Sequence, residues 1–320
     1  MTRGEYVLRR AAFALATIGI ALAVNFFIFR AAPGNPTSLL ALKPSSSPAY
    51  RQSLLHEYGL DRSLLRQFGD YVSQLAHGQL GVSTNNHVLV IQNLKTQLVN
   101  TLPMVALGTI VAIVLGTIVG LLLAWARGTA FESGGVTASL IAYSLPTQWI
   151  GIVLIILFAG TLPAGGMHDQ LLLDASFADR AADLLRHMLL PSLTLGLTVF
   201  AQYALIVRSA MLDVLGEDYM LLARAKGNRP RRLLVRHGLR TALPPIVSLT
   251  ALQIGAIAGG AVLVELVFSW PGVGRGIAQA VGQRDYPMLQ GAFLLLTVSV
   301  VLCNFVADLL AVRIDPRVAQ

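Results

Sequence analysis

Long stretches without a charged side chain constrain this chain more than any other feature of its sequence. A helix that crosses the hydrocarbon core of a membrane, about 30 Å thick, needs about 20 apolar residues. Six stretches meet this requirement, and they are too uninterrupted for barrel strands, which alternate over about ten residues. We therefore predict an all-α membrane protein with six transmembrane helices, at about residues 11–30, 98–126, 136–160, 188–211, 244–268 and 288–312.

The composition agrees with a membrane domain and excludes several other classes of protein. Of the 320 residues, 55% are apolar and 12% are charged, and the mean hydropathy is +0.66. These values exclude a disordered chain, a nucleic-acid-binding domain and an ordinary soluble enzyme. Cys303 is the sole cysteine, which excludes an intrachain disulfide and a metal cluster built on cysteines.

The basic residues indicate how the helices are oriented. Arg3, Arg9 and Arg10 precede the first apolar run as in a signal peptide. That run exceeds the about 7–15 residues of a signal's apolar region, so we expect an uncleaved anchor. The densest basic stretch, eight Lys and Arg residues from Arg208 to Arg240, lies between the fourth and fifth predicted spans. Because cytoplasmic loops carry the excess of Lys and Arg, we predict that both termini are cytoplasmic.

Two segments should lie on the outer face, residues 31–97 and 161–187. Four prolines between residues 33 and 48 predict an irregular start to the first segment. Apolar residues then recur at helical spacing from Leu54 to Leu75, which predicts a small helical cap. In the second segment we interpret the acidic residues as solvated side chains rather than a binding site; they are Asp169, Asp174, Asp179 and Asp183.

The inner segment 212–243 carries the clearest local signals. Glu217 and Asp218 stand where a short helix begins, and Arg224 and Lys226 stand where it ends. This order of charges complements the helix macrodipole. Gly227 then fits the left-handed position that follows a helix, and a proline comes shortly after it.

A second, basic helix is predicted from Arg231 to Ala242, with Pro244 and Pro245 separating it from the fifth span. We interpret the whole segment as a rigid knob of two short helices on the cytoplasmic face. The alternative is a basic loop that only anchors the topology.

The sequence carries no motif for catalysis or for a metal site. It lacks HExxH, GxSxG and the GxxxxGK[ST] phosphate loop, and its six histidines have no metal-ligand spacing. Gly272, Gly274 and Gly276 form a G-x-G-x-G after an apolar span, which indicates a turn rather than a nucleotide site. We therefore expect no enzyme activity and no cofactor on this chain, so that any energy conversion occurs on another chain.

Polar residues inside predicted spans are the remaining candidates for function, because burying them in a membrane is costly. Each of these could line a pathway or form a hydrogen bond between packed helices. Candidates for the pathway or an interface are Gln148, Gln202, Gln253 and Glu265. Asn304 and Asp308, one turn apart, are expected to tie the sixth span to a neighbour. Small residues in the fifth span permit close packing, either within the chain or against a second subunit.

Several motifs together resemble those of the permease family of dipeptide, oligopeptide and nickel ABC importers. EDYMLLARAKG at 217–227 is similar to the cytoplasmic EAA motif of that family. The other similar stretches are PGNP at 33–36, YGLD at 58–61, HGQLG at 77–81, SLPTQW at 144–149, LPSLTLGL at 190–197, GGAVLVELVFSWPGVG at 259–274, RDYPMLQG at 284–291 and DPR at 315–317.

The resemblance implies a type I importer permease fold and a coupling helix that docks on a cytoplasmic ATPase. It assigns this role to Glu217, Asp218, Ala223, Arg224, Ala225, Lys226 and Gly227. Leu221 and Leu222 replace the usual Arg and Thr, which suggests a more apolar ATPase groove. Asn35 and Gln79 replace acidic residues of the outer motifs, and Gln148 replaces an aromatic residue.

The partners implied by the resemblance are a second homologous permease, two ATPase subunits that carry ATP and Mg²⁺, and an extracytoplasmic binding protein, all in or at a bacterial inner membrane. The implied substrate is a short peptide, with nickel chelates, opines or small glycans as alternatives. An ion-driven carrier and a polytopic membrane enzyme are rival classes. The expected organisation is a first span at 1–30, a cap at 31–97, a five-span core at 98–312 and a tail at 313–320.

Overall fold

The computed structural model describes residues 3–31, 61–169, 176–228, 233 and 238–314 as an all-helical protein with one isolated β-bridge, Val82 to Leu89. The helices in chain order are α1 (Arg3–Ala31), α4 (Leu64–Ala76), α5 (Val90–Trp125), α6 (Ala130–Ser144), α7 (Thr147–Leu157), α8 (Phe177–Leu215), α9 (Asp218–Ala225), α11 (Leu239–Val267), α12 (Val273–Gln283) and α13 (Tyr286–Ile314).

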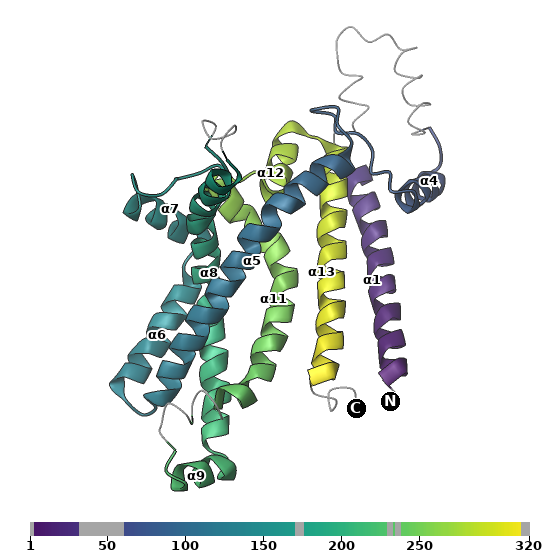
Figure 1. Ribbon diagram of the computed structural model, residues 1–320. Coiled ribbons are helices and arrows are strands. Elements are labelled where there is room, and N and C mark those ends of the chain that lie inside the picture. Colours follow the sequence, from purple (N-terminus) through teal and green to yellow (C-terminus); the bar gives the residue numbers. More distant parts are fainter. Residues whose placement is uncertain (1–2, 32–60, 170–175, 229–232, 234–237, 315–320) are drawn as a thin grey trace.

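The long helices run between two opposite ends of the molecule (Figure 1). At one end lie α9, the start of α1, the end of α13 and the α5–α6 turn; we call this the α9 end. At the other lie α4, α7 and α12; we call this the α12 end. The start of α1 and the end of α13 therefore lie at the same end of the molecule as α9, which agrees with the prediction that both termini and the basic segment 212–243 share one side.

Among the described residues, four helices are long and apolar enough to cross a membrane: Gly4–Arg30, Val90–Trp125, Phe177–Leu215 and Tyr286–Val306. The bent pair of α6 and α7 makes a fifth candidate. The span predicted at 136–160 is not one continuous helix, because the two helices meet at 100°. Pro146 explains the break: it disfavours helical geometry in the preceding residue, and Leu145 is extended (φ −70°, ψ 134°).

The helix ends also differ from prediction. α5 and α8 begin well before the apolar runs that predicted them, at Val90 and Phe177. The Ser176 hydroxyl caps α8 by accepting a hydrogen bond of 3.3 Å from the Asp179 N–H. Residues 177–187 are therefore helix rather than loop. Apolar content marks where a helix is buried in lipid, but caps decide where it ends.

Pro244 and Pro245 do not separate two helices, contrary to prediction. α11 starts at Leu239 and continues through both prolines to Val267. They stand in its first two turns, so the helix loses only the bonds of two missing N–H groups, and membrane helices tolerate this. Of the predicted basic helix at 231–242, residues 231, 232 and 234–237 lie outside the described residues, and 239–242 belong to α11.

Among the described helices, α5 and α8 have the most extensive contact. Three glycines of α5 have no room for a side chain: a Cβ on Gly108, Gly116 or Gly120 would come within 3.0 Å of α8 atoms. Small residues allow two membrane helices to approach backbone to backbone. α5 and α8 therefore pack as one rigid unit along most of their length.

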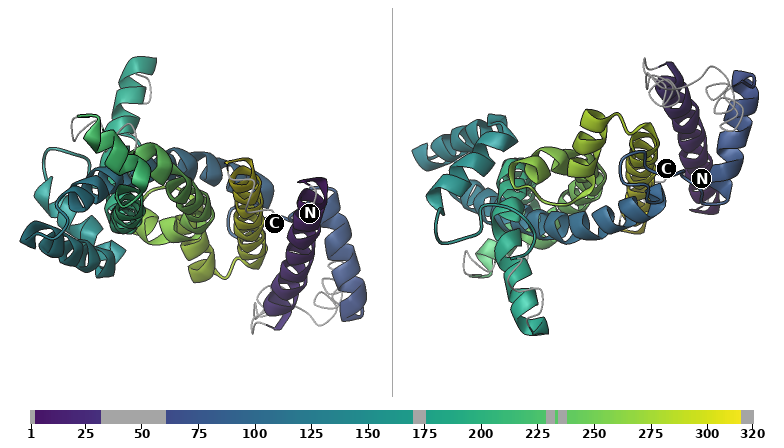
Figure 2. Two further views of the ribbon diagram at one scale, coloured as in Figure 1. Left: turned by 90° about the horizontal axis from the view of Figure 1, so that it is seen from below. Right: turned by 90° about the horizontal axis from the view of Figure 1, so that it is seen from above.

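α1 lies at the edge of the molecule, between α13 and α4 (Figure 2). Near the α9 end, Arg10 Nη2 donates to Asp308 Oδ1 at 2.9 Å. Near the α12 end, the Asn25 side chain donates to the Gln290 carbonyl at 3.0 Å. α4 crosses the outer part of α1, where the Phe26 and Phe68 rings lie 5.3 Å apart. α4 fits the later part of the predicted cap; residues 32–60 lie outside the described residues.

Candidate functional site

α9 forms a short helix that projects at one end of the molecule (Figure 1). A tight turn at Gly216 and Glu217 joins it to α8, with the Glu217 N–H donating to the Val214 carbonyl at 3.2 Å. Asp218 lies in its first turn. Gly227 has φ +72°, as its predicted position after the helix requires. The local geometry expected from the charges and the glycine is confirmed.

One face of α9 packs against the rest of the chain, and the other is exposed. Met220 is buried with Val214 and Leu233, and Ala223 packs against this cluster. The Asn228 side chain donates to the Ala223 carbonyl at 2.9 Å, which satisfies a carbonyl in the last turn.

The remaining side chains of this segment form an exposed surface, which we call the knob. Leu222 is 57% exposed. The knob consists of the exposed residues Glu217, Asp218, Tyr219, Leu222, Ala225, Lys226 and Gly227. Arg224 belongs to the same helix, but its side chain lies outside the described set. Of the sequence-predicted coupling residues, Asp218, Ala223, Arg224 and Ala225 thus lie in α9, and Glu217, Lys226 and Gly227 directly flank it.

Glu265 lies at the opposite end, inside the protein. It is fully buried, its Oε1 accepts a hydrogen bond from Thr101 Oγ1 at 2.7 Å, and its Oε2 accepts one from the Arg275 N–H at 3.0 Å. Arg275 is the third residue of α12, so the Glu265 carboxylate caps the N-terminus of that helix from α11. The expectation that Glu265 lines a pathway does not fit this placement, because all of its surface is covered by its own chain.

Two residues of α5 complete this polar cluster: Thr101, which is buried, and Asn100, which is half-buried. Thr101 Oγ1 also accepts from the Val273 N–H at 3.0 Å, and the Asn100 side chain donates to the Pro271 carbonyl at 2.9 Å. Trp270 Nε1 donates to the Asn100 carbonyl at 2.9 Å. We call Asn100, Thr101, Glu265 and the segment 270–275 the buried clasp. It joins α5, α11 and α12 at the α12 end.

The three glycines of the G-x-G-x-G serve close packing at this clasp. A Cβ on Gly272 would come within 3.0 Å of Glu265 Oε1 and Thr101 Oγ1. Gly274 and Gly276 are similarly close to Val262 and Gln97. The segment was predicted to be a turn; instead Gly272 is the N-cap of α12, and the other two lie in its first turns.

The other predicted polar residues are dispersed. Gln148 is half-buried in the first turn of α7, and Gln202 is half-buried in α8. Gln253 lies in α11, but its side chain is outside the described set. Asp308 ties α13 to α1 through Arg10, as expected, whereas Asn304 is exposed. The structure therefore does not bring these residues together in one site.

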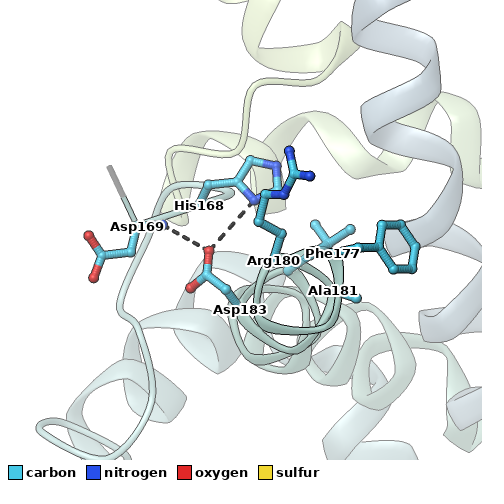
Figure 3. A pocket seen from close by; sticks show the side chains of 7 residues that line it. His168, Asp169, Phe177, Arg180, Ala181 and Asp183 are labelled. Atoms are coloured by element: carbon cyan, nitrogen blue, oxygen red, sulfur yellow. Dashed lines mark hydrogen bonds and ion pairs between the residues drawn. The ribbon is translucent and has the colours of Figure 1, made fainter. Parts of the chain in front are cut away.

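A cavity of about 420 Å³ opens beside the first turns of α8 (Figure 3). Its wall includes Asp183, which is buried. One Asp183 carboxylate oxygen accepts from the Asp169 N–H at 2.9 Å and lies 3.6 Å from His168 Nδ1, and the other lies 3.1 Å from His187 Nδ1. Asp183 thus ties the preceding segment to α8, and the prediction that it is merely solvated is wrong. Within the described ranges, no group of three or more His, Cys, Asp or Glu residues could hold a metal ion.

Sequence reasoning missed an ion pair near the α9 end. Arg208 of α8 donates to Glu132 of α6, and Glu132 is 7% exposed. Two signals could have found it. Thr129 and Glu132 have the S/T-x-x-E spacing of a capping box. Glu132 is also the sole charged residue of 128–167, and Arg208 directly follows an uncharged run.

Comparison with known family models identifies the family of this chain. Residues 112–320 match the family model described as binding-protein-dependent transport system inner membrane component. The chain belongs to this family. Residues 3–105 match the N-terminal model of binding-protein-dependent transport system membrane components. The members of this family are permease subunits, so the chain is a membrane permease rather than an enzyme.

Similar proteins cover the whole chain. It is 36% identical to the di/tripeptide transport system permease protein DppB of Pseudomonas aeruginosa and to the dipeptide transport system permease protein DppB of Escherichia coli, each over 98% of both chains. It is 32% identical to the oligopeptide transport system permease protein AppB of Bacillus subtilis, also over 98% of both chains.

A solved structure of the MetNI methionine ABC transporter in inward-facing conformations has a similar fold. The TM-score is 0.55 at 19% sequence identity, over 70% of this chain and 97% of that one. The likeness shows that the chain has the permease fold of a type I ABC importer.

Proposed function

We propose that this chain is one permease subunit of an ATP-driven, binding-protein-dependent importer of short peptides, and that it forms half of the translocation pathway. The proposal depends most on one observation: a short helix with the EAA-like sequence projects from the α9 end, with one face anchored and the other exposed. Full-length similarity to permeases named for dipeptides, tripeptides and oligopeptides supports the substrate class.

The knob is the surface on which an ATPase would act. Met220 anchors it to the end of α8, so a force on α9 is transmitted to a helix that spans the molecule. Acidic residues at the start of α9 and Lys226 at its end give the knob a defined polarity, and Leu222 adds an apolar contact. ATP and Mg²⁺ would be bound by two ATPase subunits, and a second, homologous permease would complete the pathway.

In the proposed topology the α9 end is cytoplasmic, so both termini are cytoplasmic and the α12 end meets an extracytoplasmic binding protein. α11, with 29 residues, supplies a further span, which brings the total to six when α6 and α7 are counted as one. Reporter fusions provide a direct check. A fusion after Arg231 should report the cytoplasm and one after Asp174 the exterior; the reverse pattern would contradict the topology.

The decisive experiment is reconstitution of the full complex in proteoliposomes. The chain, its partner permease, the ATPases and the binding protein should together import a labelled dipeptide only when ATP is present on the side of the membrane where the ATPases are bound. An ionophore that collapses ion gradients should leave uptake unchanged. Uptake that follows an ion gradient without ATP would overturn the importer assignment, and competition by a nickel chelate or a glycan but not by peptides would overturn the substrate class.

A further inference from the structure

A partly buried ion pair joins α6 to α8 two turns before α8 ends: the Glu132 side chain is 10% exposed and the Arg208 side chain 28%. Arg208 Nε donates to Glu132 Oε1 at 2.9 Å, and Arg208 Nη2 donates to the same oxygen. The second carboxylate oxygen, Oε2, accepts from the Gly128 N–H at 2.6 Å. The Glu132 N–H in turn donates to the hydroxyl of the N-cap Thr129 at 3.3 Å. Glu132 is thus held at once by the α5–α6 turn and by α8.

We propose that Arg208 and Glu132 are a positioning pair that makes α6 and α7 follow α8 when an ATPase displaces the knob. The inference rests on the proposed function and adds to it a specific route by which motion at the α9 end reaches the α12 end.

The first step of the route is the attachment of α9 to α8. Met220 packs against Val214 across the short turn, so displacement of α9 moves the end of α8. α5 follows α8 because its glycines leave no space between the two helices. α6 packs against α5 at Gly135, where an added Cβ would meet the Leu123 side chain, but its outer face is exposed, with Phe131, Leu140 and Ile141 each more than half exposed. A helix held from one side needs a directional contact to follow its neighbour.

The second step runs through the bend to the α12 end. α6 continues across the 100° break into α7. Gly151 of α7 lies against the end of α11, where an added Cβ would be 3.1 Å from Val267 Cγ1 and 3.2 Å from Phe268 Cε2. The Phe268 carbonyl also accepts a hydrogen bond of 2.8 Å from the Gly166 N–H. These residues directly follow Glu265 of the buried clasp, so the route connects the two ends of the molecule.

The chemistry of the pair favours positioning over simple stabilisation. A buried ion pair often stabilises a protein no more than apolar side chains of the same size would. Its guanidinium nevertheless restricts direction, because it is planar and its donors are fixed relative to one another. With Oε1 bound to α8 and Oε2 bound to the α5–α6 turn, rotation of α6 about its axis would break one of the two contacts.

The test measures uptake and ATP hydrolysis together in the reconstituted complex. We expect Arg208→Gln and Glu132→Gln to retain ATP hydrolysis but to lower the peptide imported per ATP by about tenfold, within the range of about 5–150-fold typical of coupling between sites. The double variant should be no worse than either single variant, because both remove one interaction. The double variant also leaves no unpaired charge at this position, so it can be measured in place of a single variant that fails to insert into the membrane. Arg208→Lys should retain part of the coupling.

Arg10→Gln is the control, because it removes another ion pair between an arginine and a carboxylate, a more exposed one between α1 and α13, off the proposed route. It should leave the import per ATP unchanged. Equal loss in Arg10→Gln and Arg208→Gln, or full coupling in the double variant, would overturn the proposal.

A distance measurement tests the pair independently of the substrate. With Cys303 replaced by serine, spin labels at Ser133 on α6 and Asp213 on α8 should give one narrow distance distribution with and without nucleotide on the bound ATPases. In Arg208→Gln the distribution should broaden when nucleotide is added. No broadening would contradict the positioning role, whereas failure of the wild-type complex to import peptides would contradict the proposed function alone.

Discussion

The two ends of this protein use polar residues in opposite ways. At the α9 end, charged residues are exposed on a small helix that is anchored by one face. At the α12 end, Glu265 is completely buried and both of its oxygens are satisfied by the same chain. A charge in a membrane protein therefore does not identify a pathway by itself. Its hydrogen-bond partners decide whether it contacts another molecule or holds the fold together.

From this comparison we expect variants of the buried clasp to unfold the protein. Variants of the knob should leave it folded but uncouple ATP hydrolysis from import. The largest effect should come from Gly272→Ala. Its new Cβ would overlap Glu265 and Thr101, which are both buried and cannot retreat. We expect a loss of about 2–5 kcal/mol from overpacking and broken hydrogen bonds. Fluorescence-detected size-exclusion chromatography should show little folded protein. Gly69→Ala, at an open helical position, is the control and should behave as wild type.

Glu265→Ala should have the next largest effect, and it separates the two readings of this residue. It leaves the Thr101 O–H and the Arg275 N–H without their acceptor, and each such buried group costs about 1–3 kcal/mol. Thermal unfolding in detergent should therefore begin at a lower temperature, and Glu265→Gln, which keeps an acceptor and the shape, should recover part of the loss. If Glu265→Ala has normal stability but has lost uptake, Glu265 lines the pathway instead.

At the knob, Gly227→Val should uncouple the complex without unfolding it. Gly227 has φ +72° and no atom within 4 Å of an added Cβ, so the cost is backbone strain of about 1–3 kcal/mol rather than a clash. The end of α9 should shift, and ATPase association and substrate-stimulated hydrolysis should be lost while membrane insertion is normal. Glu217→Lys should act in the same direction by opposing the helix dipole.

Gly160→Val is the matched control for Gly227→Val. Gly160 has φ +80° and equally open surroundings, but it lies in the turn after α7, away from the knob. It carries the same strain and should leave ATPase association intact. If Gly227→Val and Glu217→Lys both bind the ATPase normally, the α9 segment is only a basic topology anchor.

The sequence predicted those parts of the fold that depend on local interactions. The apolar runs place α1, α5, α8 and α13, and the charge order with Gly227 places α9 and its end. Pro146 signals a bend, but the length of the apolar run around it predicts one span. A stricter use of the rule for residues before proline would have divided that span.

The buried clasp could not be predicted, because its partners are distant in the sequence. Thr101 and Glu265 are 164 positions apart, and Asn100 and Trp270 are 170 apart. A sequence shows that an acid lies at membrane depth but not which helix packs against it. The same limit applies to the glycines of α5, whose role is evident only once α8 is placed beside them.

The smallest predicted effect tests the apolar character of the knob. Leu222 is 57% exposed and stands where the resembling family has a polar residue, so it should be buried on ATPase binding. Leu222→Ala should weaken ATPase binding by about 1–2 kcal/mol, or about tenfold, since full burial of a leucine contributes about 1.5–3 kcal/mol. Alanine favours helix at least as well as leucine, so α9 should remain folded and the loss can be assigned to the contact. Leu65→Ala, on exposed α4 at the other end, should leave ATPase affinity unchanged. Equal affinity of Leu222→Ala and wild type in a titration with purified ATPase would show that the groove contacts only the charged and small residues of the knob.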